Sequence, residues 1–258
     1  MNSIQWTACF TLLRKEVLRW RKVWLQTVMA PVVTALLYVL IFGHVLEGRI
    51  EVFEGVSYTS FLIPGLLMMS VIQNAFANTS SSLIQSKVMG SIVFVLLPPF
   101  SALEMYIAYI GAALLRGLAV GVGVFLLAVF YVQIPPIHSI FFVLCFAILG
   151  SICVGSIGLI AGMWAEKFDQ IAAFQSFLIV PLTFLSGVFY SINSLPAFWY
   201  QLSRFNPFFY MIDGFRYGFF GQSDQPILLS LWIMVIATIL LAGLTIRMLA
   251  SGYKLRDA

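Results

Sequence analysis

The amino-acid sequence predicts an all-α integral membrane protein with six transmembrane helices, an N-terminal interfacial amphipathic helix and re-entrant helices before the last span. Three observations lead to this fold class. Only 9% of the 258 residues are charged, whereas soluble domains carry about 25%. Several runs without Asp, Glu, Lys or Arg are long enough to cross a bilayer. The segment 206–221 is too aromatic for a water-facing loop and too charged for an ordinary span.

Composition also limits the kinds of ligand to expect. The net charge of +4 comes from basic residues clustered at the chain ends, as in membrane proteins with positive cytoplasmic loops, and does not indicate nucleic-acid binding. Cys9, Cys145 and Cys153 lack metal-ligand or redox spacing, so we expect small hydrophobic side chains and no metal. A cleavable signal peptide is not expected, because the basic cluster 14–22 lies well inside the chain.

The stretch 10–26 has the pattern of an amphipathic helix. Apolar side chains recur at helical spacing, and most basic ones fall on the other faces. Such a helix lies in the membrane interface with its basic face toward lipid phosphates; a simple topology anchor is a compatible alternative. The apolar positions are Leu12, Leu13, Val17, Trp20 and Trp24, and the basic ones are Arg14, Lys15, Arg21 and Lys22.

Six apolar stretches can each form a spanning helix of about 20 residues. The charge-free stretch 117–165 is too long for one span, and Pro135-Pro136 divides it. A β-barrel is excluded because the apolar runs are continuous and do not alternate. We therefore expect a single transmembrane domain over 1–258, with spans near 26–46, 58–82, 105–131, 137–163, 171–191 and 227–249.

The distribution of charge predicts the topology. Six spans place both termini on one side, which then holds ten of the 14 Lys and Arg residues, against three on the other side and Arg116 within a span. Because cytoplasmic loops carry the excess of Lys and Arg, both termini are expected in the cytoplasm. The acidic loop 47–57 would face outward.

The largest cytoplasmic connection, 83–104, is mostly apolar. We expect a short helix near 86–96 and a turn at Pro98-Pro99. Ser101 and Glu104 then form an S-x-x-E capping box for the third span. An apolar helix on this face favours a partner that covers it, with simple contact to the membrane interface as the alternative.

Arg116 and two glycine pairs stand out within the spans. A charge at the centre of a span costs at least about 2.5–3.5 kcal/mol, so Arg116 should face the bundle interior or a wet cavity on a transport path. The alternative is an arginine that extends to a nearby interface. The pairs Gly117–Gly121 and Gly158–Gly162 fit the G-x-x-x-G pattern and indicate tight helix packing or a dimer face.

The segment 194–221 precedes the last span and breaks at Asn206-Pro207. Asn206 can cap the second helix, and Pro207 suits its first turn. Asp213 and Arg216 are i, i+3 neighbours that can neutralise each other. Neither piece spans a bilayer, so we expect re-entrant helices buried in protein or lining a cavity. An aromatic belt at the headgroup level is the alternative.

The block from Ile179 to Arg216 resembles the signature region of the ABC-2 type permeases of ATP-binding-cassette transporters. The stretches 57–83 and 181–199 also resemble bacterial inner-membrane members of that family, and the similarity covers essentially the whole chain. The residues that carry the signature are Ile179, Leu182, Leu185, Ser186, Val188, Leu195, Pro196, Pro207, Phe208, Tyr210 and Arg216.

The resemblance implies a homodimeric permease in the lipid of the bacterial inner membrane, working with two cytoplasmic ATPase subunits. The sequence contains no G-x-x-x-x-G-K-[ST] motif, so ATP and Mg²⁺ belong to the partner ATPase. This chain itself is expected to be no enzyme and to hold no cofactor. The resemblance places the ATPase contact on the first cytoplasmic loop and the N-terminal helix. The expected contact residues are Lys87, Val88, Met89, Ile92, Phe94, Arg14 and Arg19.

The family type implies export, and we expect the cargo to be amphipathic: a lipid, a glycolipid or oligosaccharide, or a hydrophobic drug-like molecule. Aromatic side chains near the outer mouth suit sugar rings and apolar groups equally. An ion-coupled secondary transporter, which usually shows broken spans in repeated halves, and a membrane-embedded enzyme with clustered titratable residues are the alternatives. The transport path or outer gate is expected at Arg116, Phe208, Tyr210, Asp213, Arg216 and Tyr217.

Overall fold

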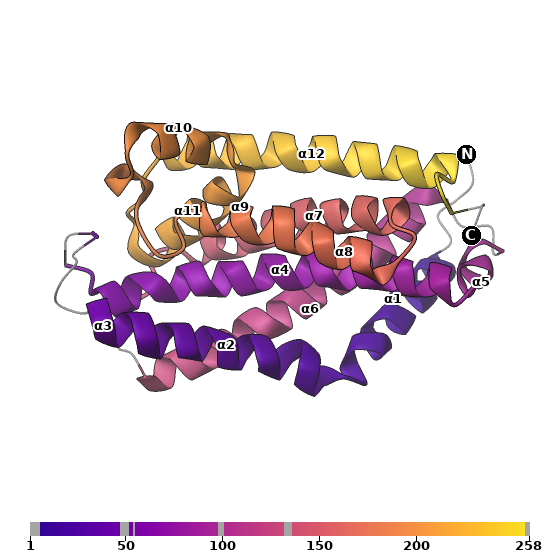
Figure 1. The fold of residues 1–258 in the computed structure, drawn as a ribbon, viewed down its shortest axis with the longest axis horizontal. Helices are drawn as coiled ribbons and strands as arrows, with labels where there is room; N and C mark the ends of the chain where they lie inside the picture. The colour runs from indigo at the N-terminus through magenta and orange to yellow at the C-terminus, as the bar shows by residue number, and fades with distance from the viewer. Residues whose placement is uncertain (1–5, 47–51, 54, 98–100, 132–135, 256–258) are drawn as a thin grey trace.

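The computed structural model describes residues 6–46, 52–53, 55–97, 101–131 and 136–255. These residues form an elongated helical bundle (Figure 1). The described ranges contain no β-strand, only an isolated bridge between Phe53 and Val56. The predicted all-α membrane fold class is confirmed. The predicted turn at Pro98-Pro99, Pro135 of the Pro pair and the acidic residues of the 47–57 loop lie outside the described residues.

Five of the described helices are long and apolar enough to span a membrane, and they match five of the predicted spans. The first is continuous but contains two π-helical segments, so it comprises η1 (Leu25–Met29), α2 (Ala30–Tyr38), η2 (Val39–Gly43) and α3 (His44–Leu46). The other four are α4 (Tyr58–Val88), α6 (Ala102–Tyr131), α7 (Ile140–Trp164) and α12 (Ile227–Ser251).

The predicted fifth span, 171–191, is shorter than expected. It is a single run made of α8 (Phe168–Phe174), η3 (Gln175–Ile179) and α9 (Val180–Phe184). At 1.5 Å per residue the run is about 25 Å long, less than the bilayer core of about 30 Å. The helix ends before Gly187, whose φ of +73° is left-handed. The six-span count is therefore not confirmed by helix length.

The segment before the last span forms two short helices, as the sequence predicts. They are α10 (Ala197–Phe205) and α11 (Pro207–Phe220), preceded by the short η4 (Ile192–Ser194). The break at Asn206-Pro207 is confirmed, and Asn206 Oδ1 accepts a hydrogen bond from the Phe208 amide at 3.0 Å. Helix α11 is almost wholly buried and packs on α4, α7 and α12. It lies beside α9, at the end of the bundle that also holds α10 (Figure 1).

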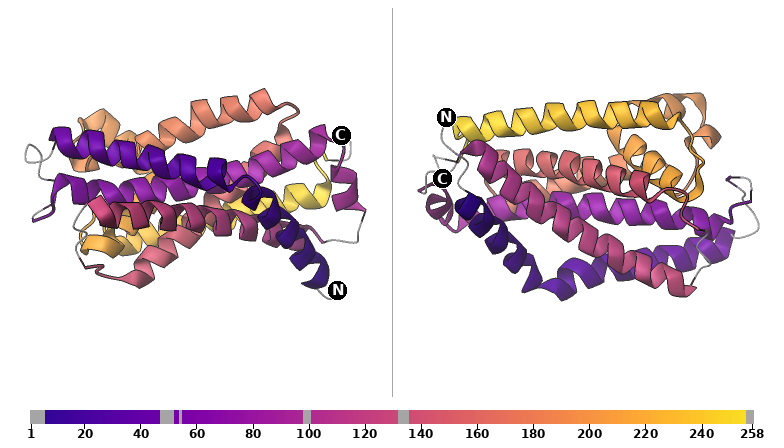
Figure 2. Two further views of the ribbon diagram at one scale, coloured as in Figure 1. Left: turned by 90° about the horizontal axis from the view of Figure 1, so that it is seen from below. Right: turned by 180° about the vertical axis from the view of Figure 1, so that it is seen from behind.

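The opposite end of the bundle gathers α1 (Trp6–Arg21), α5 (Ile92–Leu96) and the end of α12 (Figure 1). Helix α1 is inclined to the bundle axis (Figure 2). The predicted helix near 86–96 is divided: α4 continues to Val88, and Gly90, with φ +66°, turns the chain into α5. The capping box is confirmed, because the Ser101 amide donates to Glu104 Oε2 at 2.7 Å and the Glu104 amide donates to Ser101 Oγ at 3.2 Å.

Helix α4 is the centre of the bundle, with 89% of its most apolar window buried. The predicted close packing at the glycine pairs is confirmed. A Cβ on Gly158 of α7 would lie 2.1 Å from Thr79 Oγ1 and 2.7 Å from the Phe76 carbonyl oxygen of α4. On the α6 side, a Cβ on Gly121 would lie 2.9 Å from a Val71 methyl group. Small residues on two neighbours therefore let α4 approach both backbones.

We expect Gly158→Ala to lower the free energy of unfolding by about 1–3 kcal/mol, because the new methyl group meets backbone that cannot move aside. Gly243→Ala on α12 is the matched control, since its Cβ would have no atom within 4 Å. Thermal unfolding of the purified chain in detergent compares the two. Equal melting temperatures would contradict the close contact between α4 and α7.

Candidate functional site

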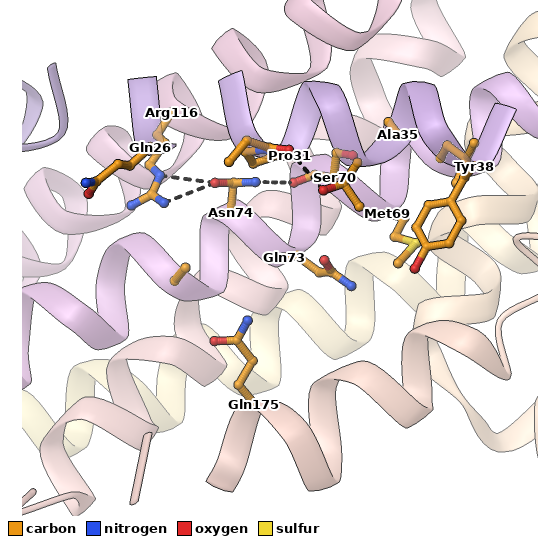
Figure 3. A pocket seen from close by; sticks show the side chains of 14 residues that line it. Gln26, Pro31, Ala35, Tyr38, Met69, Ser70, Gln73, Asn74, Arg116 and Gln175 are labelled. Carbon is orange, nitrogen blue, oxygen red and sulfur yellow. Dashed lines mark hydrogen bonds between the residues drawn. The ribbon is translucent and has the colours of Figure 1, made fainter. Parts of the chain in front are cut away.

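A polar cavity of about 320 Å³ lies between α2, α4, α6 and η3 (Figure 3). Arg116 and Asn74 lie close to the midpoints of α6 and α4, so the cavity reaches the middle of the bundle. Gln26 and Thr34 are exposed, which shows that the cavity opens on the side of the chain. Its polar lining comprises Gln26, Thr34, Tyr38, Ser70, Gln73, Asn74, Arg116 and Gln175.

The prediction that Arg116 faces a cavity is confirmed. Arg116 is only 9% exposed, and its Nε and Nη2 donate to Asn74 Oδ1 at 3.2 Å and 3.1 Å. The Asn74 amide nitrogen donates to the Ser70 carbonyl at 3.0 Å, which turns the Asn74 oxygen toward the arginine (Figure 3). Whether cargo passes Arg116 stays a prediction.

Most of the other polar residues of the cavity were missed by sequence reasoning. Gln26, Gln73, Asn74 and Gln175 are uncharged, and each lies inside or beside a predicted span. A search for charges alone passes over them. The usable signal is that amide side chains inside a span need a polar partner or a wet cavity.

The predicted ion pair between Asp213 and Arg216 does not form; no salt bridge joins them in the described part of the chain. Both side chains are buried in α11. Asp213 Oδ1 accepts from the Asp224 amide at 2.8 Å, whereas Arg216 Nη2 donates to the Gly187 carbonyl at 2.8 Å. The Arg216 guanidinium also lies 3.8 Å from the Phe61 ring centroid. The two charges thus hold different loops to α11, because buried charges need hydrogen-bond partners and backbone groups supply them.

The remaining residues expected at the outer gate also pack inside the protein. Phe208 is 1% exposed, and Tyr210 is buried with its hydroxyl donating to the Arg204 carbonyl at 2.8 Å. Tyr217 is half-buried against His138 and Phe142. None of these α11 residues lines the polar cavity. The structure gives them a packing role, and a role in the path stays a prediction.

The residues expected to contact an ATPase divide into outward and inward groups. Val88, Met89 and Phe94 are 54%, 68% and 76% exposed, but Ile92 is fully buried. Lys87 is only 8% exposed. Its ammonium donates to the Met163 and Ala165 carbonyls at 2.8 Å and 2.6 Å, and so caps the end of α7. The exposed apolar group is the better test of an ATPase contact, since substitution of Lys87 would disturb α7.

The N-terminal helix is joined to α4 by a buried polar network. Glu16 is fully buried, and its Oε2 accepts from Ser82 Oγ at 2.6 Å and from Arg19 Nε at 3.1 Å. Arg19 Nη2 also donates to the Asn78 carbonyl at 2.8 Å. Arg14 by contrast is exposed. Arg19 therefore uses much of its hydrogen-bonding capacity within the protein, and contact of Arg14 or Arg19 with an ATPase stays a prediction.

Glu16→Ala should lower the free energy of unfolding by roughly 1–3 kcal/mol, because it leaves Arg19 Nε and the Ser82 hydroxyl without their acceptor. Arg14→Ala, on the exposed face of the same helix, should change it by less than about 0.5 kcal/mol. Thermal unfolding and chymotryptic cleavage within α1 measure both effects. If Glu16→Ala is as stable and as resistant to chymotrypsin as Arg14→Ala, the network does not hold α1.

Long apolar helices around a charged cavity at mid-depth define a polytopic membrane protein with an internal site for a polar group. The chain belongs to the ABC-2 type transporter family, which matches residues 7–220. The inner membrane transport permease YadH of Escherichia coli strain K12 is 40% identical over 236 residues, or 92% of each chain. Nodulation protein J of Rhizobium leguminosarum bv. viciae is 22% identical over 237 residues, covering 91% of this chain and 90% of that protein. The chain is thus a transport permease subunit.

Proposed function

We propose that this chain is the membrane subunit of an ATP-driven exporter in the bacterial inner membrane, with both termini in the cytoplasm. Two copies would form the translocation unit, and two separate ATPase subunits would bind ATP and Mg²⁺. The observation that carries the proposal is the polar cavity beside Arg116, at mid-depth in a member of a permease family. The relative YadH, described as an inner membrane transport permease, supports the location.

An amphipathic cargo suits the lining of the cavity. Arg116 and several amide side chains line it together with the apolar residues Ala35, Leu66 and Met69. A polar head group would find hydrogen bonds there, and an apolar chain would remain in contact with hydrocarbon side chains. A lipid, a glycolipid or a hydrophobic drug-like molecule has both a polar part and an apolar part of this kind.

The side opening of the cavity supports a homodimer. Gln26 and Thr34 present polar groups on an outer face of the single chain, within the first span. Lipid tails offer no hydrogen bonds, so polar lining at this depth is costly unless protein or water covers it. A second copy related by two-fold symmetry would enclose the two cavities in one path.

The apolar end surface formed by Val88, Met89 and Phe94 supports contact with the ATPase. Adjacent exposed hydrophobic side chains of this kind mark interaction sites. The surface begins on the last residue of α4, so movement of a bound ATPase would be passed directly to the central helix. Closure of two ATPases would then tilt the two permease subunits and move cargo outward.

Phe94→Asp should reduce recovery of the ATPase with the tagged, detergent-extracted permease at least about tenfold, because a charge replaces an apolar contact. The matched control is Phe205→Asp at the opposite end of the bundle, where the side chain is 85% exposed. Quantitative mass spectrometry of the purified complexes measures the ratio. An undiminished ratio for Phe94→Asp, or equal losses for the two variants, would contradict docking at this surface.

A further inference from the structure

The charge of Arg116 lacks an acidic partner. The ion pairs within the described residues join Glu16 to Lys15 and Arg19, and Glu166 to Lys254; none includes Arg116. The described residues that line the cavity include no Asp or Glu. Arg116, a residue only 9% exposed at the middle of the bundle, therefore has only neutral neighbours among the described residues that line its cavity.

Asn74, the neutral partner of Arg116, accepts hydrogen bonds from only two of the three guanidinium nitrogens. Nε and Nη2 share one acceptor, Asn74 Oδ1. Arg116 Nη1 forms no hydrogen bond to a described residue. It is also not fully buried, because it is absent from the set of fully buried atoms that have no partner. Nη1 therefore reaches accessible space beside the cavity. Arginine has five N–H donors in a fixed fork that matches oxyanions, so this side chain has donors left for a ligand.

The rest of the lining suits the same ligand. Gln26, Gln73 and Gln175 also line the cavity, and Figure 3 shows Gln73 and Gln175 farther from the guanidinium than Asn74 is. None of these three glutamine side chains makes a hydrogen bond to another described residue, so their N–H groups can turn toward an anion. Farther along the cavity, Ala35 and Met69 offer apolar surface.

We propose that this cavity binds the oxyanion head group of an amphiphile, a phosphate or a carboxylate, through Arg116. Charge-assisted hydrogen bonds from the guanidinium hold the anion, Asn74 keeps the guanidinium in place, and the apolar end receives the start of the hydrocarbon chain. A bound anion also offsets the cost of an arginine at mid-membrane depth. This inference rests on the proposed function, because it assigns a charge class to the cargo.

The test uses the full chain in nanodiscs of zwitterionic lipid, with lysophosphatidic acid and the monoacylglycerol of the same acyl chain as probes. Wild-type protein should bind the anionic probe at least about tenfold more tightly, as measured by calorimetry. Arg116→Gln should bring the two dissociation constants within about twofold, whereas Arg204→Gln, on the exposed face of α10, should leave the preference unchanged. Equal affinities in the wild-type protein, or a preference that survives Arg116→Gln, would overturn the proposal.

Asn74→Asp gives a second test that does not remove the arginine. The new carboxylate would lie within hydrogen-bond distance of the guanidinium and act as a built-in counterion, so the affinity for lysophosphatidic acid relative to that for the monoacylglycerol should fall at least about tenfold. An undiminished preference of Asn74→Asp for the anionic probe would overturn the proposal even if Arg116→Gln fails to fold.

Two further measurements separate the possible failures. Inorganic phosphate should compete with lysophosphatidic acid only at much higher concentration; equal potency would show a site for free anions and overturn the assignment to an amphiphile. ATP-dependent movement of the monoacylglycerol by the complex, without a preference for the anionic probe, would sustain the proposed function and refute the anion site. Anionic probe that binds at Arg116 but is never moved would refute the proposed function alone.

Discussion

The close backbone contact between α4 and its glycine-bearing neighbours is the constraint on which the rest of the structure depends. Helix α4 is buried along most of its length, and Gly158 and Gly121 let α7 and α6 approach it without intervening side chains. At that distance the Thr79 hydroxyl can donate to the Gly155 carbonyl of α7 at 2.9 Å. The central helix can therefore carry polar residues, because its neighbours are close enough to satisfy them.

Those polar residues connect the functional parts of the molecule. Asn74 orients Arg116 in the cavity, and Asn78 and Ser82, one and two turns farther along α4, bind the N-terminal helix. The last residue of the helix, Val88, begins the exposed apolar surface. A displacement at that surface thus acts on a single rigid helix that also carries a wall of the cavity. In the proposed complex, this arrangement would pass movement of the ATPase to the middle of the bundle.

The sequence predicts well what depends on local patterns. Runs of apolar residues locate five spans, the S-x-x-E motif marks the start of α6, and Asn206-Pro207 marks the break between α10 and α11. It predicts poorly what depends on neighbours far along the chain. Burial of Glu16, 66 residues from Ser82, and of Lys87, 76 residues from Met163, is set by how helices pack.

In the cavity too, the residue marked by its local sequence could be predicted, and the partner supplied by a distant helix could not. Arg116 is visible in the sequence because a charge inside an apolar run is costly. Its partner Asn74 lies 42 residues away and on another helix, so only the packing of α4 against α6 reveals it. The expected Asp213–Arg216 ion pair does not form for the same reason: packing brings distant backbone groups to each side chain. Arg216 donates to the Gly187 carbonyl, and Asp213 accepts from the Asp224 amide.

The most direct measurement of the central claim is movement of a fluorescent amphiphile across the bilayer of proteoliposomes that contain this chain and the ATPase recovered with it. Our account predicts net movement that requires ATP hydrolysis and both polypeptides, and that stops when either is omitted. Equal movement in vesicles that hold only this chain and no ATP would contradict the account.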